Sequence, residues 1–329
     1  MRTRFITYED RQVDELAVKL LALSVKQYEP SAVLRYYTLS EPNELCAFLS
    51  GLGNCEVVSG YEAKRSGYSI KAELLLDALD ETADRAVWID SDIILSRAVS
   101  DVLHANAIDE LIVSDERTTV LPRGVIEWAV ASGLEPRDDE LGFTTNTCVV
   151  AATHAHRALL QDWGDLMDRE DYRDTQAQTF DERPFHLRTD QDVLGALIGS
   201  KKYQDIQVRA LRNSWDIAQC HSYRSYSLME RFLVTIFGGT RMVHAQGEKP
   251  WRVENSGSFS ARFHPYRLAA RPFAPQLGEA DRGWLEPGTG VTRILERICG
   301  RNHVLAGCMT FMDALARRVL SRLKRRPHI

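Results

Sequence analysis

The feature that most constrains the fold is an alternation of strand-like and helix-like segments over residues 4–89. Short runs of β-branched and aromatic residues predict strands at 4–8, 32–39, 55–59 and 86–89. Apolar residues at helical spacing predict intervening helices at 13–28, 42–50 and 69–79. Because strands joined through helices run parallel, the sequence predicts an α/β protein with a mostly parallel, Rossmann-like central sheet flanked by helices.

The next part of the chain extends this pattern. Apolar runs predict two more strands at 111–115 and 145–152, and helical spacing predicts a helix over 156–169. The segment 170–188 is polar and shows no apolar periodicity, so it is predicted to be an irregular loop at the surface.

Two later segments carry local signals. Residues 189–200 are predicted to form a helix, with the side-chain oxygen of Thr189 or Asp190 capping its first backbone N–H groups. In 232–247 two adjacent glycines separate apolar runs, which is typical of a hairpin.

Composition excludes several classes of protein. With 44% hydrophobic and 26% charged residues, the chain is typical of a globular protein, and its net charge of -5 provides no general basic surface for nucleic acid. The six cysteines form no Cys-x-x-Cys pair, which argues against a zinc site or a disulfide framework. The sequence shows neither a signal-peptide pattern nor an apolar run of about 18 residues, so a cytoplasmic location is expected.

Two carboxylates, Asp90 and Asp92, directly follow the strand predicted at 86–89. In α/β sheets ligands bind beyond the carboxyl ends of the strands, and like charges held close together there favour a cation between them. Mg²⁺ and Mn²⁺ take carboxylate oxygens together with those of a substrate diphosphate. The alternative is a solvated turn in which Ser91 and Asp92 cap the next segment.

A second group of chemically active residues lies in the segment 242–251. His244 ends an apolar run, Gly247 permits close backbone approach, and Lys249 offers a compact positive charge for phosphate. An imidazole ligand beside two carboxylates favours Mn²⁺ over Mg²⁺. Taken singly, each of these residues is also an ordinary strand-end or loop residue.

The order of these motifs along the chain resembles glycosyltransferase family 8, which includes glycogenin and bacterial lipopolysaccharide galactosyl- and glucosyltransferases. The matching segments are WIDSD (88–92), NTCVV (146–150), DQDVL (190–194) and HAQGEKPW (244–251). The resemblance implies a GT-A fold over residues 1–256. It also implies metal-dependent transfer of a hexose, with retention of anomeric configuration, from a nucleotide diphosphate sugar such as a uridine diphosphate hexose. The acceptor would be a hydroxyl of a glycan or of a lipid-linked molecule, as in polysaccharide biosynthesis.

Roles for single residues follow from this resemblance. Asp90, Asp92 and His244 would bind Mn²⁺, or else Mg²⁺, against the donor diphosphate. Gly247 and Lys249 would contact the phosphates.

The rest of the donor site is assigned in the same way. Asp190 would orient the sugar hydroxyls, Gln191 would lie near the anomeric carbon, and Asn146 would line the sugar pocket. The resemblance also assigns to the donor site Lys71, Ser91, Thr7, Tyr8 and Asp10, the last three of which would hold the base and ribose. Alternative roles are helix capping for Asp190 and ordinary turn or helix-start positions for the others.

The sequence departs from the family pattern at two places. Cys148 stands where the family usually has glycine, and TYEDRQ (7–12) replaces the usual Asp-Asn-Tyr element. As to mechanism, Gln191 is a poor nucleophile, so attack of the acceptor from the face of the leaving group is favoured, with Asp190 as the alternative nucleophile.

Residues 257–329 lie outside the resemblance and are predicted to form a helical C-terminal extension. Its last part, 303–329, has apolar residues at helical spacing and a cluster of arginines near its end. Such a helix can lie on an anionic membrane, here the inner face, or it can pack on the protein with its arginines completing the helix dipole.

Two rival functions remain from the sequence. One is a metal-dependent phosphohydrolase or nucleotidyltransferase that uses Asp90 and Asp92. The other is a catalytically silent carbohydrate-binding protein, in which the altered residue Cys148 marks a degraded site.

Overall fold

The computed structural model describes residues 3–65, 67–81, 83–103, 109–116, 125–220, 239–247, 249–252, 262, 264–299, 305, 308 and 312. The chain divides into two compact units. The first unit comprises Met1–Gln12, Val25–Ser91 and Val99–Asn213. The second comprises Val13–Ser24, Asp92–Ala98 and Ser214–Ile329.

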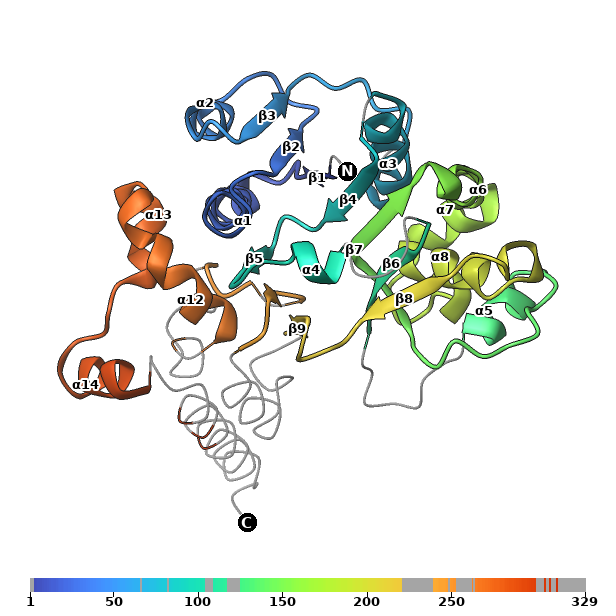
Figure 1. The fold of residues 1–329 in the computed structure, drawn as a ribbon. Helices are drawn as coiled ribbons and strands as arrows, with labels where there is room; N and C mark the ends of the chain where they lie inside the picture. The colour runs from blue at the N-terminus through green and yellow to red at the C-terminus, as the bar shows by residue number, and fades with distance from the viewer. Residues whose placement is uncertain are drawn as a thin grey trace, which may run out of the picture. The chain divides into compact units, whose positions relative to one another are not determined.

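The first unit is built on a seven-stranded sheet with the strand order β3-β2-β1-β4-β7-β6-β8 (Figure 1). Its strands are β1 (Thr3–Tyr8), β2 (Val33–Tyr37), β3 (Cys55–Val58), β4 (Arg85–Ile89), β6 (Leu111–Asp115), β7 (Thr145–Thr153) and β8 (Val208–Leu211). In the described sheet β7 runs antiparallel to β4 and β6, whereas the other pairs are parallel. The predicted mostly parallel α/β sheet is therefore confirmed.

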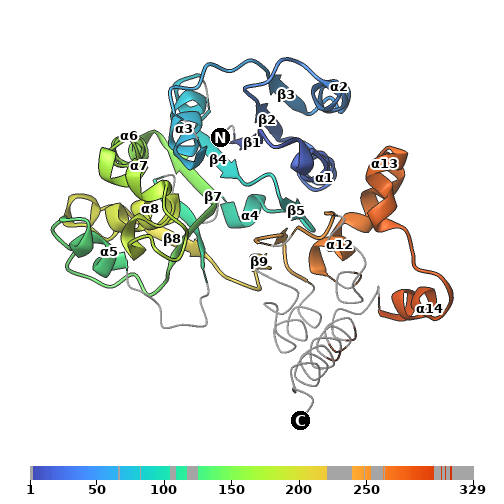
Figure 2. The ribbon, with the colours of Figure 1, turned by 180° about the vertical axis from the view of Figure 1, so that it is seen from behind.

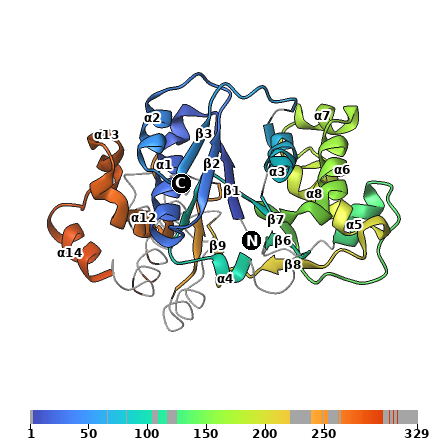
Figure 3. The same cartoon turned by 45° about the horizontal axis from the view of Figure 1, so that its top comes forward.

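Helices cover both faces of this sheet. They are α2 (Glu44–Gly51), α3 (Ile70–Glu81), α4 (Ser100–Leu103), α5 (Val125–Ala131), α6 (Arg157–Met167), α7 (Glu170–Gln176) and α8 (Asp190–Ile198). Figure 3 shows α3, α6 and α8 on one side of the sheet and α2 on the other. The apolar faces of these three helices meet in one core cluster. It includes Leu75 of α3, Trp163 of α6 and Leu194 of α8, all of which are fully buried. α3 packs against β4 and α8 packs against β7, the two strands beside the candidate site.

The segment 170–188, predicted to be an irregular loop, contains the helix α7 and a short 3-10 turn, Phe185–Leu187. Tyr172 and Thr175 are buried on one side of α7, three residues apart, while charged or polar residues occupy its other positions. The apolar stripe of this helix is too short for periodicity to reveal it, so the prediction was wrong here. Thr189, one of the two predicted caps, is the N-cap of α8.

The second unit contains a three-stranded sheet in the order β5-β10-β9. Its strands are β5 (Ile93–Leu95), β9 (Ile217–Gln219) and β10 (Met242–His244). β10 pairs antiparallel with β5 and parallel with β9, which places His244 opposite both Ile93 and Gln219. The first arm of the hairpin predicted at 232–247 lies outside the described residues.

The remaining described helices are α1 (Glu15–Tyr28), which begins in the second unit, and α12 (Pro265–Ala270), α13 (Glu279–Arg282) and α14 (Gly290–Cys299). α12 packs against β5 and β10, and Figure 2 shows α12 close to β5. Its Tyr266 lies against the ring of Trp251, with 5.1 Å between the ring centroids. Trp251 also donates a hydrogen bond from Nε1 to Asp14 Oδ1 at 3.3 Å, so the loop after β10 is anchored at its tryptophan.

Residues 264–299 of the predicted C-terminal extension belong to the second unit, together with β5, β9 and β10. The boundary predicted near residue 256 stays a prediction. The basic helix predicted at 303–329 lies outside the described residues, apart from positions 305, 308 and 312. Within the described part of the chain, no helix has both the length and the apolar character needed to cross a bilayer.

Candidate metal centre and donor site

The reversed direction of β7 determines which residues lie beside Asp90. Asp90 follows the buried strand β4, and its backbone N–H donates to the carbonyl oxygen of Cys148 at 2.8 Å. Because β7 is antiparallel to β4, the beginning of β7 meets the end of β4. Asn146 and Thr147, which begin a strand, therefore lie at the same sheet edge as Asp90, which ends one.

Lys71, from the first turn of α3, joins two acidic residues at this edge. Its Nζ lies 3.0 Å from Asp90 Oδ1 and 3.1 Å from Asp190 Oδ2. The hydroxyl of Thr147 donates to the same oxygen of Asp190 at 2.6 Å. Burial by itself lowers the pKa of Lys71, but the charges of Asp190 and Asp90 outweigh it and hold this pKa above its ordinary value. The ammonium group is thus a charged, fixed bridge between the β4 and α8 carboxylates.

A chain of amide groups runs beside this bridge. Asn146 Nδ2 donates to Gln191 Oε1 at 3.0 Å, and Gln191 Nε2 donates to the carboxylate of Glu116. The backbone N–H of Cys148 donates to Asn146 Oδ1 at 2.9 Å, which fixes the orientation of that amide. The structure therefore brings together Asn146 and Gln191, both predicted for the sugar pocket.

Cys148 replaces the glycine of the family pattern without opening the sheet. Its side chain is buried, and its Sγ lies 3.3 Å from the hydroxyl oxygen of Ser114 on the neighbouring strand β6. The cysteine is therefore packed as part of the sheet.

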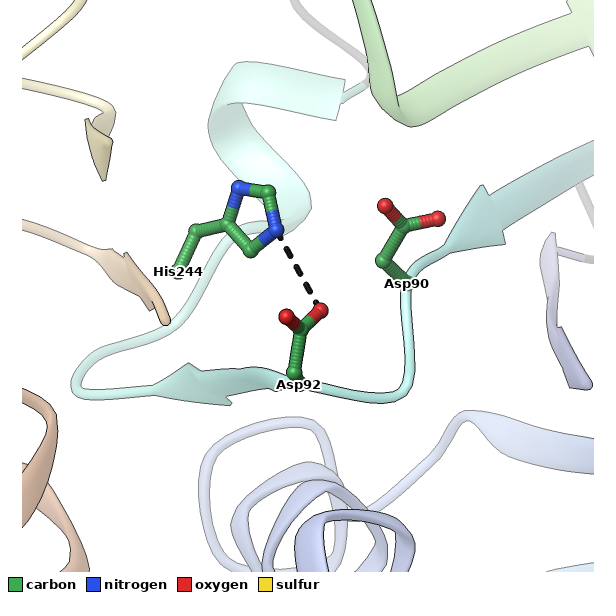
Figure 4. A group of neighbouring side chains, drawn as sticks. All are labelled: Asp90, Asp92 and His244. Atoms are coloured by element: carbon green, nitrogen blue, oxygen red, sulfur yellow. Dashed lines mark ion pairs between the residues drawn. The ribbon is translucent and has the colours of Figure 1, made fainter. Parts of the chain in front are cut away.

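Asp90, Asp92 and His244 form a group suited to a cation (Figure 4). Each offers one ligand atom, and these atoms all lie within 4.8 Å of one another. His244 Nε2 is 3.2 Å from Asp92 Oδ1. The imidazole at the end of β10 thus lies beside the two aspartates, and the binding of a metal ion by these three residues stays a prediction.

Lys249 gives Asp92 a second positive partner. Its Nζ bonds to Asp92 Oδ2 and donates to the carbonyl oxygen of Ala245 at 2.9 Å. Burial alone would raise the pKa of Asp92, but His244 and Lys249 hold it well below its usual range. Gly247, in the same loop, has φ +82°, a conformation that strains any residue with a Cβ.

The donor set of this group fits a divalent cation. Two carboxylates supply hard oxygen ligands, and one imidazole supplies nitrogen, which suits Mn²⁺ better than Mg²⁺. The negative charge of both aspartates is balanced by lysine ammonium groups, Lys71 on Asp90 and Lys249 on Asp92. The residues present can therefore exchange lysine contacts for a metal ion without leaving a carboxylate unpaired.

The residues predicted to bind the base and ribose lie at the end of β1. Thr7 is fully buried, and its Oγ1 has no hydrogen-bond partner among the described residues. Burial and the neighbouring Asp10 raise the pKa of Tyr8. The hydroxyl of Ser91 donates a hydrogen bond to Glu9 Oε2 at 2.7 Å, so the Ser91 side chain contacts the residue that directly follows β1.

Several residues of the site were missed from the sequence: Glu9, Glu116, Thr147 and Gln219. Each contacts a predicted residue through a strand pairing or a long-range hydrogen bond. No local pattern marks Glu116 or Gln219, whereas Thr147 lies inside the NTCVV motif and could have been included.

Asp192, the third residue of the DQDVL motif, provides a test of the α8 helix start. Its Oδ2 accepts a hydrogen bond from the backbone N–H of Thr189 at 2.7 Å. Burial raises its pKa to about 7, with Glu116 and Asp190 adding to the effect, although the bonds from Thr189 lower it. The folded protein thus keeps a proton that the unfolded chain releases near pH 4.

Stability is therefore expected to fall as pH rises from about 4 to 7, by on the order of 2–4 kcal/mol. The Asp192→Asn variant, which keeps an acceptor for Thr189, should lose much less over this range in urea unfolding. The control is Asp162→Asn. Lys202 and Tyr203 lower the pKa of Asp162 despite its burial, so this carboxyl group is already ionised at pH 4 and should not contribute to the change between pH 4 and 7. An identical pH slope in wild type and Asp192→Asn would contradict the prediction.

Comparison with solved structures places this architecture in a class: the chain has the fold of the GT-A glycosyltransferases. A structure of an active-site mutant of LgtC has 16% sequence identity and a TM-score of 0.50, and the match covers 86% of this chain and 100% of that one. A second structure, of the galactosyltransferase LgtC with donor and acceptor sugar analogs, has 16% identity and a TM-score of 0.48 over the same shares. The bifunctional glycosyltransferase WbbM matches with 12% identity and a TM-score of 0.46 over 77% of this chain and 47% of that one.

No protein-family model matches the sequence, and no curated protein matches it. The order of four motifs suggested a resemblance to glycosyltransferase family 8, and the match to the solved LgtC structure agrees with it in fold.

Proposed function

We propose that this protein is a Mn²⁺-dependent glycosyltransferase that moves a hexose from a nucleotide diphosphate sugar to a hydroxyl acceptor with retention of configuration. The observation that carries the proposal is the grouping of Asp90, Asp92 and His244 with a lysine on each carboxylate. A site of this charge pattern suits a metal-bound diphosphate, because the lysines gain phosphate partners when the cation takes the carboxylates.

The diphosphate end of the donor is assigned to the loop after β10. A cation held by Asp90, Asp92 and His244 would supply positive charge against the departing diphosphate. Lys249 lies beside Asp92 and would hold a phosphate oxygen, while Gly247 leaves its backbone open to close approach. Fixed charge aimed at the leaving group is commonly the largest contribution to catalysis.

The sugar end is assigned to Asn146, Asp190 and Gln191. Asp190 Oδ2 already accepts a hydrogen bond from Thr147 and an ion pair from Lys71, which makes it a weak nucleophile and supports a role in orienting sugar hydroxyls. Gln191 carries no charge, which supports attack by the acceptor from the face of the leaving group. The departing phosphate would then receive the acceptor proton.

The partners are proposed by the same reasoning. Uridine diphosphate hexose is the proposed donor, and the acceptor is a hydroxyl of a glycan or lipid-linked molecule. If the 303–329 segment forms the basic helix predicted, the enzyme would work in the cytoplasm against the inner membrane face, and this remains a prediction.

The test is a thermal-shift and hydrolysis screen of nucleotide diphosphate sugars with and without Mn²⁺. A donor should raise the melting temperature only with metal and should be hydrolysed slowly. Metal-dependent release of phosphate from aryl phosphates, with no response to any nucleotide sugar, would favour the phosphohydrolase rival. Metal-independent sugar binding without hydrolysis would favour the catalytically silent rival.

Lys249 should act on metal and diphosphate in opposite directions. In a Lys249→Met variant Asp92 loses its ammonium competitor, so Mn²⁺ alone should bind about fivefold tighter, the effect of about 1 kcal/mol. Uridine diphosphate should bind about 10–100-fold more weakly, since a charge-assisted hydrogen bond is lost. Isothermal titration calorimetry measures both affinities.

The control for this prediction is Lys201→Met, which removes an exposed lysine paired with Glu135. It should alter neither affinity. Weaker Mn²⁺ binding in Lys249→Met than in the wild type would show that this lysine does not compete with the cation.

A further inference from the structure

Gln219, which the sequence did not single out, contacts the ring of His244 directly. Its Oε1 lies 2.6 Å from His244 Nδ1. Both side chains are buried, with Gln219 2% and His244 4% exposed. Gln219 ends β9 and His244 ends β10, in register with each other.

This hydrogen bond determines which ring nitrogen carries the proton. The amide oxygen of Gln219 can only accept, so His244 Nδ1 must be the donor. In the neutral ring the lone pair is then on Nε2, which faces Asp92 Oδ1 at 3.2 Å. Two acceptors that face each other in a buried site repel, and a shared cation, either a proton or a metal ion, removes that repulsion.

The side-chain contact is not needed to hold the strands together. β9 and β10 are already joined by parallel backbone pairing, and the N–H of Cys220 donates to the carbonyl oxygen of His244 at 3.0 Å. The backbone pairing therefore sets the position of His244, and the amide of Gln219 orients its imidazole ring.

We propose that Gln219 is a positioning residue that presents Nε2 of His244 to the cation and thereby determines a preference for Mn²⁺ over Mg²⁺. The inference rests on the metal site of the proposed function. Imidazole nitrogen is the ligand of this group that discriminates between the two ions, because Mg²⁺ is satisfied by carboxylate and water oxygens. Loss of a residue that orients a histidine ligand typically lowers metal affinity 10–100-fold.

Two variants of nearly equal size separate orientation from packing. Gln219→Met keeps the length of the side chain and removes the acceptor. Gln219→Glu keeps an acceptor for the Nδ1 proton. Isothermal titration calorimetry on the full-length protein, without nucleotide, measures the Mn²⁺ and Mg²⁺ affinities of each, and thermal unfolding checks the fold.

Gln219→Met is expected to lose about 10–100-fold in Mn²⁺ affinity and much less in Mg²⁺ affinity, so that the ratio of the two falls. Gln219→Glu should keep the wild-type ratio or increase it, because a carboxylate also orients the ring and makes it more basic. In a His244→Ala background, Gln219→Met should have no further effect on either affinity.

An unchanged Mn²⁺ to Mg²⁺ ratio in a folded Gln219→Met protein overturns the inference, and so does an equal loss for both ions. If Gln219→Met does not fold, a Gln219→Glu protein with a reduced ratio overturns it equally. A wild-type protein that binds neither ion removes the proposed metal site itself, whereas normal binding with an unresponsive ratio removes only the role of Gln219.

Discussion

Replacing Asp92 by alanine is expected to lower Mn²⁺-dependent hydrolysis of the nucleotide sugar at least about a hundredfold, the range measured when one group that stabilises the transition state is removed. Asp92 contacts both His244 and Lys249. Its loss removes a metal ligand and leaves the Lys249 ammonium without its carboxylate partner. Hydrolysis rates and Mn²⁺ affinity, measured on the same folded preparation, check the prediction.

Two further variants support this experiment. Asp92→Asn keeps the shape of the side chain and should still lose metal binding, which separates charge from packing. Asp139→Ala removes an exposed aspartate that pairs with Arg137 and should leave the rate unchanged. Wild-type hydrolysis in a folded Asp92→Ala protein would be incompatible with the proposed site.

Lys71→Met is expected to destabilise the metal-free protein by about 3–5 kcal/mol, the usual cost of removing one partner from a buried ion pair. Lys71 is buried and bridges Asp90 and Asp190. Methionine fills the same space but leaves two carboxylates close together without a cation. Urea unfolding in the presence of a chelator measures the change.

A double variant shows whether charge is the cause. Adding Asp190→Asn to Lys71→Met removes one of the unpaired carboxylates and should recover part of the lost stability. Lys202→Met, which breaks an exposed pair with Asp162, should change stability little. Equal stability of Lys71→Met and the wild type would mean that the bridge contributes nothing.

Much of the fold could be predicted because it depends on local patterns. Apolar runs and helical spacing indicated β1 to β4 and the helices between them, and strand-to-helix alternation predicted a mostly parallel sheet. The short helix α7 was missed because Tyr172 and Thr175 are too few to form a visible stripe. Its helical state is favoured by burial of those two side chains, which is a tertiary effect.

The candidate site divides in the same way. The position of Asp90 could be predicted from the apolar strand before it. Gly247 could also be predicted as a backbone position that needs glycine, and its φ of +82° agrees with this. The pairing of Asn146 with Gln191, 45 residues apart, depends on how β7 and α8 meet. The spacing of residues in the sequence does not show that β7 and α8 bring these two side chains into contact.

The sequence by itself determined the strands, the helices between them and the residue types that end each strand, because these depend on neighbours within a few positions. Only the tertiary structure decided that β7 is reversed, which brings Asn146 and Thr147 to the edge where Asp90 lies. It also decided that Gln219 faces His244 across 25 residues of chain. The physical reason is that strand pairing and side-chain hydrogen bonds between distant segments are chosen by the packing of the whole unit.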